Sequence, residues 1–206
     1  MRQLGCALTS WVLLIPVTPM QTPAPRSINE ILVALDSENA LIRRNAVRAA
    51  AELGTSASAA VPALERALRQ EAQRLGVGEV DWVAIDDIFH AFSAIGAPSL
   101  PTLSGILANP WCQETIEAPE ACSDADVDFR RRGFAAIGRM GRVGVPTLMR
   151  FLAERDWWLR YSAASTLAWL GPEAKEAAPA LRLALRDTNE SVRGAAGIAL
   201  SRIEGQ

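Results

Sequence analysis

The chain has 206 residues, half of them apolar, and its 21 basic and 23 acidic side chains leave a net charge of −2. This near-neutral balance argues against the basic surface that binding to a phosphate backbone requires, so nucleic acid is not expected as a partner. Lys175 is the only lysine, so arginine supplies nearly all of the positive charge.

Residues 1–24 have the composition of a secretory signal peptide. Arg2 precedes an apolar run from Leu4 to Val17, and a polar, proline-rich segment follows. The run is shorter than the ~20 residues that span a bilayer as a helix, so no membrane span is expected in the mature chain. We therefore expect an exported protein, periplasmic or secreted. The alternative is a start at Met20, which would leave the protein in the cytoplasm.

A pattern of apolar residues, glycine and proline recurs from residue 27 to the end of the chain. In the first four copies, small or apolar residues follow one another at helical spacing up to a glycine, and a proline comes five to eight residues later. The last copy ends at Ile203-Glu204 without a glycine in register. Such a segment is typical of a helix with one buried stripe and a glycine cap. The pattern predicts five helix pairs, approximately over residues 27–54, 58–96, 98–141, 143–171 and 173–205.

A helix pair of this length can bury its apolar face only against its neighbours. We therefore expect one all-α domain, an α-solenoid of about five helix pairs over residues 25–206. The fourth copy shows the pattern clearly, with Leu159-Arg160, Ala163, Leu167 and Leu170-Gly171 followed by Ala178-Pro179.

These residues resemble the HEAT repeat family, and particularly the short variant found in phycobilin lyase subunits. In that family a unit has an outer helix with a proline, a turn with an aspartate, and an inner helix that opens with Val-Arg. The resemblance covers Ser27 to Glu204 and implies an armadillo/HEAT-type superhelix. It also implies structural pairs of a turn acid and an arginine: Asp36 with Arg43, Asp124 or Asp126 with Arg130, Glu154 or Asp156 with Arg160, and Asp187 with Arg193.

A second stripe on the inner helices points away from the predicted core. Tyr161, Ser165 and Trp169 follow at intervals of four residues, and the same register places arginines, acids and a histidine in the other units. Arginine and exposed aromatic residues are enriched at binding hot spots. The candidate groove for a protein partner comprises Arg44, Arg48, Asp86, His90, Arg131, Arg139, Trp158, Tyr161, Trp169 and Arg202. The alternative is that the tryptophans fill gaps between units.

Neither catalytic residues nor a metal site are predicted. His90 is the only histidine, and no nucleophile motif accompanies it. The acids from Asp124 to Asp128 alternate as in a calcium loop, but arginines occupy the places where a glycine turn and further oxygen ligands belong. In an oxidising compartment Cys112 and Cys122 would be able to form a disulfide, and otherwise they are two separate thiols.

We therefore predict a non-catalytic scaffold without a cofactor, which binds a protein partner of unknown identity through its concave face. One rival is a helper that resembles the bilin lyases and binds a chromophore together with a client protein. Another is a nucleic-acid reader that resembles the HEAT-like alkylation-repair glycosylases. The export signal argues against the first, and the acids Asp86 and Asp87 at the centre of the groove argue against the second.

Overall fold

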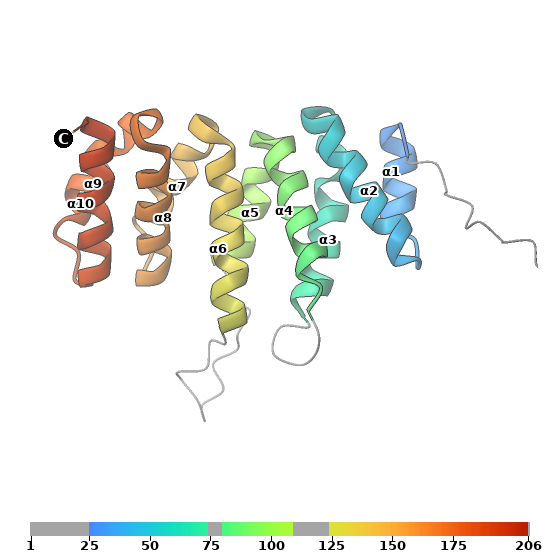
Figure 1. Ribbon diagram of the computed structural model, residues 1–206, viewed down its shortest axis with the longest axis horizontal. Helices are drawn as coiled ribbons and strands as arrows, with labels where there is room; N and C mark the ends of the chain where they lie inside the picture. The colour runs from blue at the N-terminus through green and yellow to red at the C-terminus, as the bar shows by residue number, and fades with distance from the viewer. Residues whose placement is uncertain (1–24, 74–79, 109–123, 206) are drawn as a thin grey trace, which may run out of the picture.

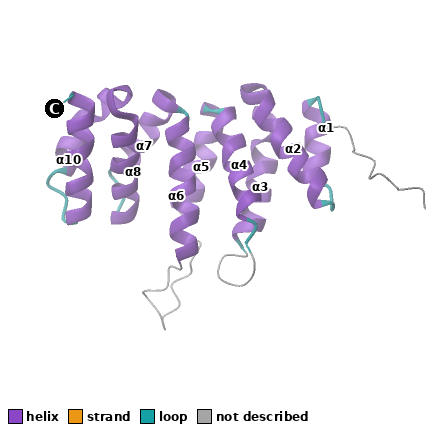
Figure 2. Cartoon of the chain, in the orientation of Figure 1, coloured by secondary structure: helices purple, strands orange, loops and turns teal. Residues whose placement is uncertain are grey.

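The computed structural model describes residues 25–73, 80–108 and 124–205 of the chain. These residues form α-helices joined by turns and short 3-10 helices, and they contain no strand (Figure 2). Within the described ranges, no helix has both the length and the apolar character that crossing a membrane requires. The predicted signal peptide at residues 1–24 and the predicted pair Cys112 and Cys122 lie outside the described residues.

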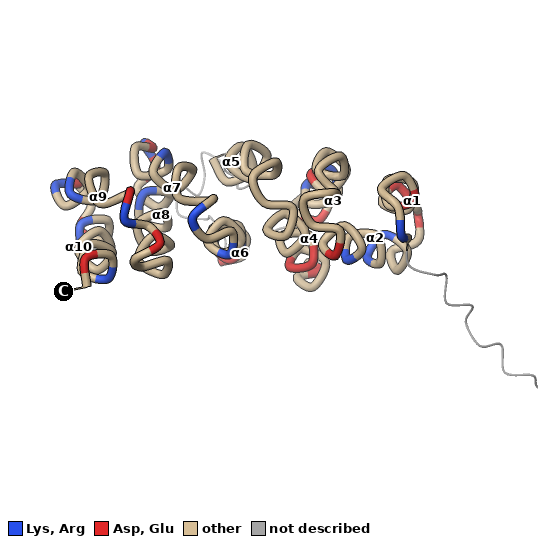
Figure 3. The backbone as a smooth tube through the Cα atoms, turned by 90° about the horizontal axis from the view of Figure 1, so that it is seen from above, with Lys and Arg blue, Asp and Glu red and all other residues tan. Residues whose placement is uncertain are grey.

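The helices form five successive pairs, which confirms the predicted all-α solenoid. The pairs stand side by side in chain order, with the first and last at opposite ends (Figure 1). Seen from above, odd-numbered helices form one row and even-numbered helices form the other (Figure 3). The pairs are α1 (Ile28–Leu35) with α2 (Ala40–Leu53), α3 (Val61–Ala72) with α4 (Trp82–Ile95), α5 (Leu100–Ala108) with α6 (Asp124–Arg139), α7 (Val145–Phe151) with α8 (Trp157–Leu170), and α9 (Ala178–Ala184) with α10 (Glu190–Glu204).

The core lies between the two rows and continues from each pair to the next. Aromatic contacts join neighbouring pairs at its centre. The rings of Phe89 and Phe129 are 5.3 Å apart, and those of Phe134 and Phe151 are 5.0 Å apart. All four rings are buried, so the chain gains their hydrophobic stabilisation only when the pairs stack.

Side-chain caps and glycines define the ends of the even-numbered helices. Asn39, Asp81, Asp156 and Asn189 accept hydrogen bonds from the first backbone N–H groups of α2, α4, α8 and α10. The predicted glycines follow the last turns of the first four even-numbered helices. Their φ angles, which favour glycine, are 55° at Gly54, 76° at Gly96, 61° at Gly141 and 56° at Gly171.

Gly144 packs so closely that alanine is expected to destabilise the protein at this position. A Cβ atom there would lie 2.5 Å from the backbone oxygen of Ile137 and 2.8 Å from its Cγ2 atom. We expect Gly144→Ala to lower the free energy of unfolding in urea by about 2 kcal/mol, as overpacking does. Gly194→Ala is the control, because that glycine lies inside α10 with open space around it, and it should stabilise by about 0.5–1 kcal/mol. Equal stability of the two variants would contradict this.

Candidate functional site

An arginine in the first turns of three even-numbered helices holds the turn that precedes its own helix. In each case one guanidinium nitrogen donates to two backbone carbonyl oxygens, five and six residues earlier in the chain. The distances are 2.8 and 2.8 Å from Arg43 to Ser37 and Glu38, 2.9 and 2.7 Å from Arg160 to Glu154 and Arg155, and 2.9 and 3.1 Å from Arg193 to Asp187 and Thr188. These bonds satisfy carbonyl groups that the turn leaves without helical partners.

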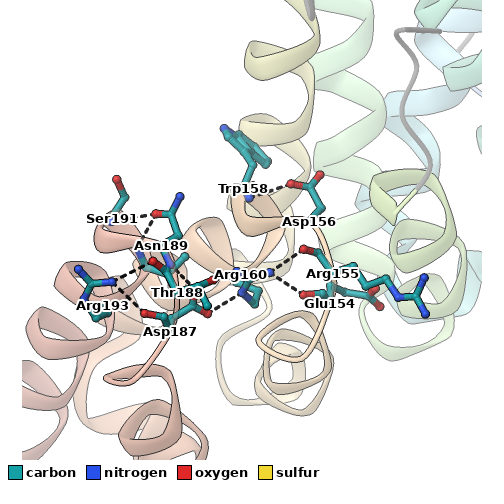
Figure 4. A network of polar contacts seen from close by, with 11 residues as sticks. Glu154, Arg155, Asp156, Trp158, Arg160, Asp187, Thr188, Asn189, Ser191 and Arg193 are labelled. Atoms are coloured by element: carbon teal, nitrogen blue, oxygen red, sulfur yellow. Dashed lines mark hydrogen bonds and ion pairs between the residues drawn. The ribbon is translucent and has the colours of Figure 1, made fainter. Parts of the chain in front are cut away.

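One of these arginines, Arg160, and the equivalent Arg130 of the preceding unit also bridge neighbouring units in the C-terminal part. Arg160 of α8 binds the carboxylate of Asp187 with two hydrogen bonds of 2.6 and 2.8 Å (Figure 4). Both side chains are nearly buried, at 13% and 10% exposure. These hydrogen bonds hold the pKa of Asp187 below its ordinary value and raise that of Arg160. One unit earlier, Arg130 of α6 binds Asp156 at 3.1 Å, and that aspartate also caps α8.

Three of the pairs between a turn acid and an arginine therefore run between units, and this corrects the prediction for Arg43, Arg160 and Arg193. Arg43 was expected to pair with Asp36, but its guanidinium binds the backbone of the turn. Asp36 instead pairs with the exposed Arg66 at 3.1 Å. Likewise the Asp187 carboxylate binds Arg160 of the preceding unit, whereas Arg193 holds its carbonyl oxygen.

For Arg130 the structure selects one of the two predicted acids. Asp126 is buried and pairs with Arg130 at 3.1 Å, whereas Asp124 is exposed in the first turn of α6. For Arg160 it selects neither, because the carboxylate that Arg160 binds is that of Asp187. The Asp156 carboxylate caps α8 and binds Arg130, and Glu154 contributes only its carbonyl oxygen to Arg160.

A groove of about 670 Å³ lies between α6 and α8, with both helices in its walls. Five predicted residues line it together: Arg131, Arg139, Trp158, Tyr161 and Trp169. Four further lining residues were not predicted from the sequence: Val127, Phe134, Ser162 and Thr166. Val127 is one turn before Arg131 on the same stripe, so extending that stripe would have found it. The other three come from stripes nearer the core.

The aromatic residues of the groove divide into packing and exposed positions. Trp158 is half-buried against the core, with its ring 5.9 Å from that of Phe134 and 5.8 Å from the Arg130 guanidinium. Trp169 is 65% exposed and Tyr161 is 38% exposed. Trp158 therefore fills the space between two units, as the alternative interpretation predicts, while Trp169 and Tyr161 present their rings to solvent.

The remaining predicted residues lie outside this groove. Arg44 pairs with Asp81 at 2.7 Å, and Arg48 pairs with Asp87 at 3.1 Å, so α2 and α4 are joined by ion pairs. Figure 3 shows the basic stretch of α2 beside the acidic stretch of α4. His90 is exposed on α4.

A residue that was not predicted continues these pairs toward α6. Arg132 binds the carboxylate of Asp86, and its guanidinium carbon lies 4.8 Å from the centre of the Trp82 ring. At the other end of the stack, Arg202 of α10 donates to the carbonyl oxygen of Ala168 at 3.5 Å. The arginines and aspartates of α2 and α4 thus compensate one another in charge, whereas the arginines of the groove are not matched in this way.

The groove is apolar and positive. Its lining contains the arginines Arg131 and Arg139 but no acidic side chain. Arg131 also pairs with Asp128 on its own helix, whereas Arg139 forms no ion pair within the described part of the chain. No group of three or more potential metal ligands occurs among the described residues. The chemistry that this arrangement offers is recognition by apolar contact and by guanidinium hydrogen bonds.

Residues 118–204 match the family model of HEAT repeats, and this range contains the whole groove. This part of the chain consists of HEAT repeats. The predicted resemblance is thereby confirmed, and a HEAT-repeat scaffold is a fold typical of protein interaction and generally without catalysis. A search of curated protein sequences finds no match.

Solved structures with similar folds include engineered and designed repeat proteins. An engineered protein is 18% identical, with 86% of this chain and 79% of that chain covered and a TM-score of 0.37. A designed armadillo repeat protein in complex with the peptide (KR)4 is 16% identical, with 85% and 81% covered and a TM-score of 0.37. Another designed armadillo repeat protein is 17% identical, with 85% and 82% covered and the same TM-score of 0.37. At these sequence identities and TM-scores, the likeness of these solved structures to the chain concerns the fold alone.

The bridge between Arg160 and Asp187 is expected to stabilise the last two HEAT repeats. Asp187→Ala leaves a nearly buried guanidinium without its carboxylate, so we expect it to cost about 3 kcal/mol of unfolding free energy. Asp36→Ala is the matched control, because it removes an exposed ion pair and should cost less than about 1 kcal/mol. Urea unfolding measures both, and similar losses in the two variants would contradict the role of the bridge.

The same bridge predicts a dependence of stability on pH. Because the folded-state pKa of Asp187 is lowered, its stabilisation is complete above the ordinary aspartate pKa of about 4. It is lost as the pH falls through the lower folded-state value. The difference in unfolding free energy between the natural protein and Asp187→Ala should therefore be constant from pH 7 to pH 5 and shrink below about pH 4. A difference that grows on acidification would contradict this.

Replacement by alanine should affect stability differently at Trp158 and at Trp169, which lie at opposite ends of α8. Trp158→Ala removes a ring packed between two units, and we expect a loss of about 3 kcal/mol. Trp169→Ala removes a ring that is 65% exposed, so its cost should remain below about 1 kcal/mol. Thermal unfolding followed by circular dichroism compares the two. A larger loss for Trp169→Ala would show that this ring is structural.

Proposed function

We propose that the protein is a non-catalytic scaffold that binds a protein partner in the groove between α6 and α8. The observation that carries this proposal is Trp169, a large aromatic side chain that is 65% exposed at the wall of an apolar groove of about 670 Å³. An exposed apolar surface of this kind lowers solubility, and it is typical of an interaction site. Tryptophan and arginine are also the residues most enriched among binding hot spots.

The position of the groove supports the same proposal. Its walls belong to neighbouring helix pairs that are fixed to one another by the contact of Arg130 with Asp156 and by the packing of Trp158 on Phe134. A partner would therefore meet a surface that is already shaped, and little conformational entropy would be lost on binding. The composition of residues 1–24 supports export, so we propose an envelope or secreted protein as the partner.

A photo-crosslinking residue in the groove tests this function. We would replace Tyr161 by benzoylphenylalanine, an aromatic for an aromatic, and irradiate the producing cells. The control carries the same residue at Leu183, which is 74% exposed on α9 in the other row of helices. We expect a defined protein adduct from position 161 that is absent from position 183.

Adding Trp169→Ala to the position-161 protein should then reduce the adduct at least about fivefold, since hot-spot residues commonly contribute more than 1 kcal/mol. Circular dichroism would check that the doubly altered protein keeps its helical content. Equal adducts at both positions, no adduct at position 161, or an adduct that is insensitive to Trp169→Ala would each contradict the proposed function.

A further inference from the structure

We infer that the groove between α6 and α8 recognises a short acidic segment of the partner protein, in which one apolar side chain stands between two carboxylates. This inference rests on the proposed function and adds the chemistry of the segment. It follows from the charge of the groove, from the spacing of its two arginines, and from the small side chains between them.

The charge distribution is the first argument. The arginines Arg44 and Arg48 of α2 are matched by aspartates of the neighbouring helix α4 and its N-cap, in the pairs of Arg44 with Asp81 and Arg48 with Asp87. No acidic side chain lines the groove to pair with its arginines, and Arg139 has no ionic partner within the described residues. A guanidinium beside apolar walls favours a carboxylate that arrives with the ligand, because charge-assisted hydrogen bonds are stronger there than in water.

The spacing of the arginines gives the length of the segment. Arg131 and Arg139 are eight residues apart on one stripe of α6, which corresponds to about 12 Å along the helix axis. An extended chain rises about 3.3 Å per residue, so four residues cover this distance. Side chains two and four residues apart point to the same side of an extended chain. Two acids at the first and fifth positions would thus reach the two arginines.

The centre of the groove suits the apolar side chain. α6 and α8 run in the same direction (Figure 1), so Tyr161 lies toward the Arg131 end and Trp169 toward the Arg139 end. A Cβ atom on Gly138 would lie only 3.3 Å from the Trp169 ring, which places this ring against the end of α6. Between the two ends the lining includes the small side chains of Ala135 and Ser165 beside the ring of Phe134. A leucine-sized side chain at the third position of the segment would enter this space.

Nucleic acid fits the surroundings of the groove less well than an acidic peptide. Single strands need a basic path for several successive phosphates together with stacking platforms. Here Asp86 and Asp87 occupy the next helix of the row, and Asp128 lies beside Arg131. A short segment with two carboxylates uses the two arginines without approaching Asp86 and Asp87, and only its first carboxylate lies near Asp128.

The test is a selection from a display library of random nine-residue peptides on the full-length protein. The natural protein should enrich peptides with two acids four residues apart and an apolar residue midway. Arg139→Glu should lose this enrichment, whereas Arg150→Glu should retain it. Arg150 is an exposed arginine of α7 in the other row of helices, so it provides the same change of charge in the neighbouring helix pair and outside the groove.

An enriched peptide is then labelled and its affinity is measured by fluorescence anisotropy. We expect Arg139→Glu to weaken binding about tenfold, which corresponds to about 1.4 kcal/mol. We also expect higher salt to weaken binding to the natural protein, because the contacts are ionic and close to solvent. Should Arg139→Glu lose helical content, Arg139→Gln removes the charge without reversing it and replaces that variant.

The outcomes separate this inference from the function on which it rests. Peptides that bind in a manner sensitive to Trp169→Ala but carry no acidic residues would overturn the inference and leave the proposed function standing. No enrichment, or enrichment that is insensitive to Trp169→Ala, would contradict both. Displacement of the peptide by a single-stranded oligonucleotide at equal concentration would overturn the inference in favour of nucleic acid.

Discussion

The bridge from an arginine of one helix pair to the turn aspartate of the next is the contact on which the groove depends. Arg130 reaches Asp156 and thereby sets α8 beside α6, and Arg160 reaches Asp187 one pair later. A stack of repeats lacks contacts between distant units, so each junction must fix its own geometry. Because Asp156 also caps α8, the carboxylate that starts the helix places it against its neighbour. The position at which α8 begins and the width of the groove are therefore coupled.

The N-terminal and C-terminal parts of the row of even-numbered helices differ because equivalent positions carry residues of different chemistry. Asp86 of α4 corresponds to Tyr161 of α8, and His90 corresponds to Ser165. On α4 the acid is neutralised by Arg132 of the following helix. On α8 a phenol ring occupies the place of Asp86, and by the same register Ser162 occupies the place of Asp87, the partner of Arg48. The lining that α8 contributes therefore offers the arginines of α6 no carboxylate. These exchanges of residue type distinguish the groove from the charge-compensated junction between α2 and α4.

The fold could be predicted from the sequence because its determinants are local. The glycines that end the helices, such as Gly54 and Gly171, recur at fixed distances from the apolar stripe, and this register also predicted Tyr161 and Trp169 on one exposed stripe. The partner of a turn acid could not be predicted in the same way. Asp36 and Asp187 occupy equivalent turns, yet one binds Arg66 of α3 and the other binds Arg160 of the preceding unit. Asp36 belongs to the first described helix pair, so no arginine of a preceding described pair is there to bind it, and a residue of α3 takes that place.

The position of Trp169 explains how a mostly exposed aromatic ring can act as an anchor. Gly138 leaves room for the ring at the end of α6, where a Cβ atom would come within 3.0 Å of Thr166 and 3.3 Å of the indole. One edge of the ring therefore packs on the neighbouring unit while most of its surface remains in water. A ring held in this way has less rotamer freedom to lose when a ligand covers it, and this lowers the entropic cost of binding. The glycine of one repeat thus makes room for the proposed binding residue of the next.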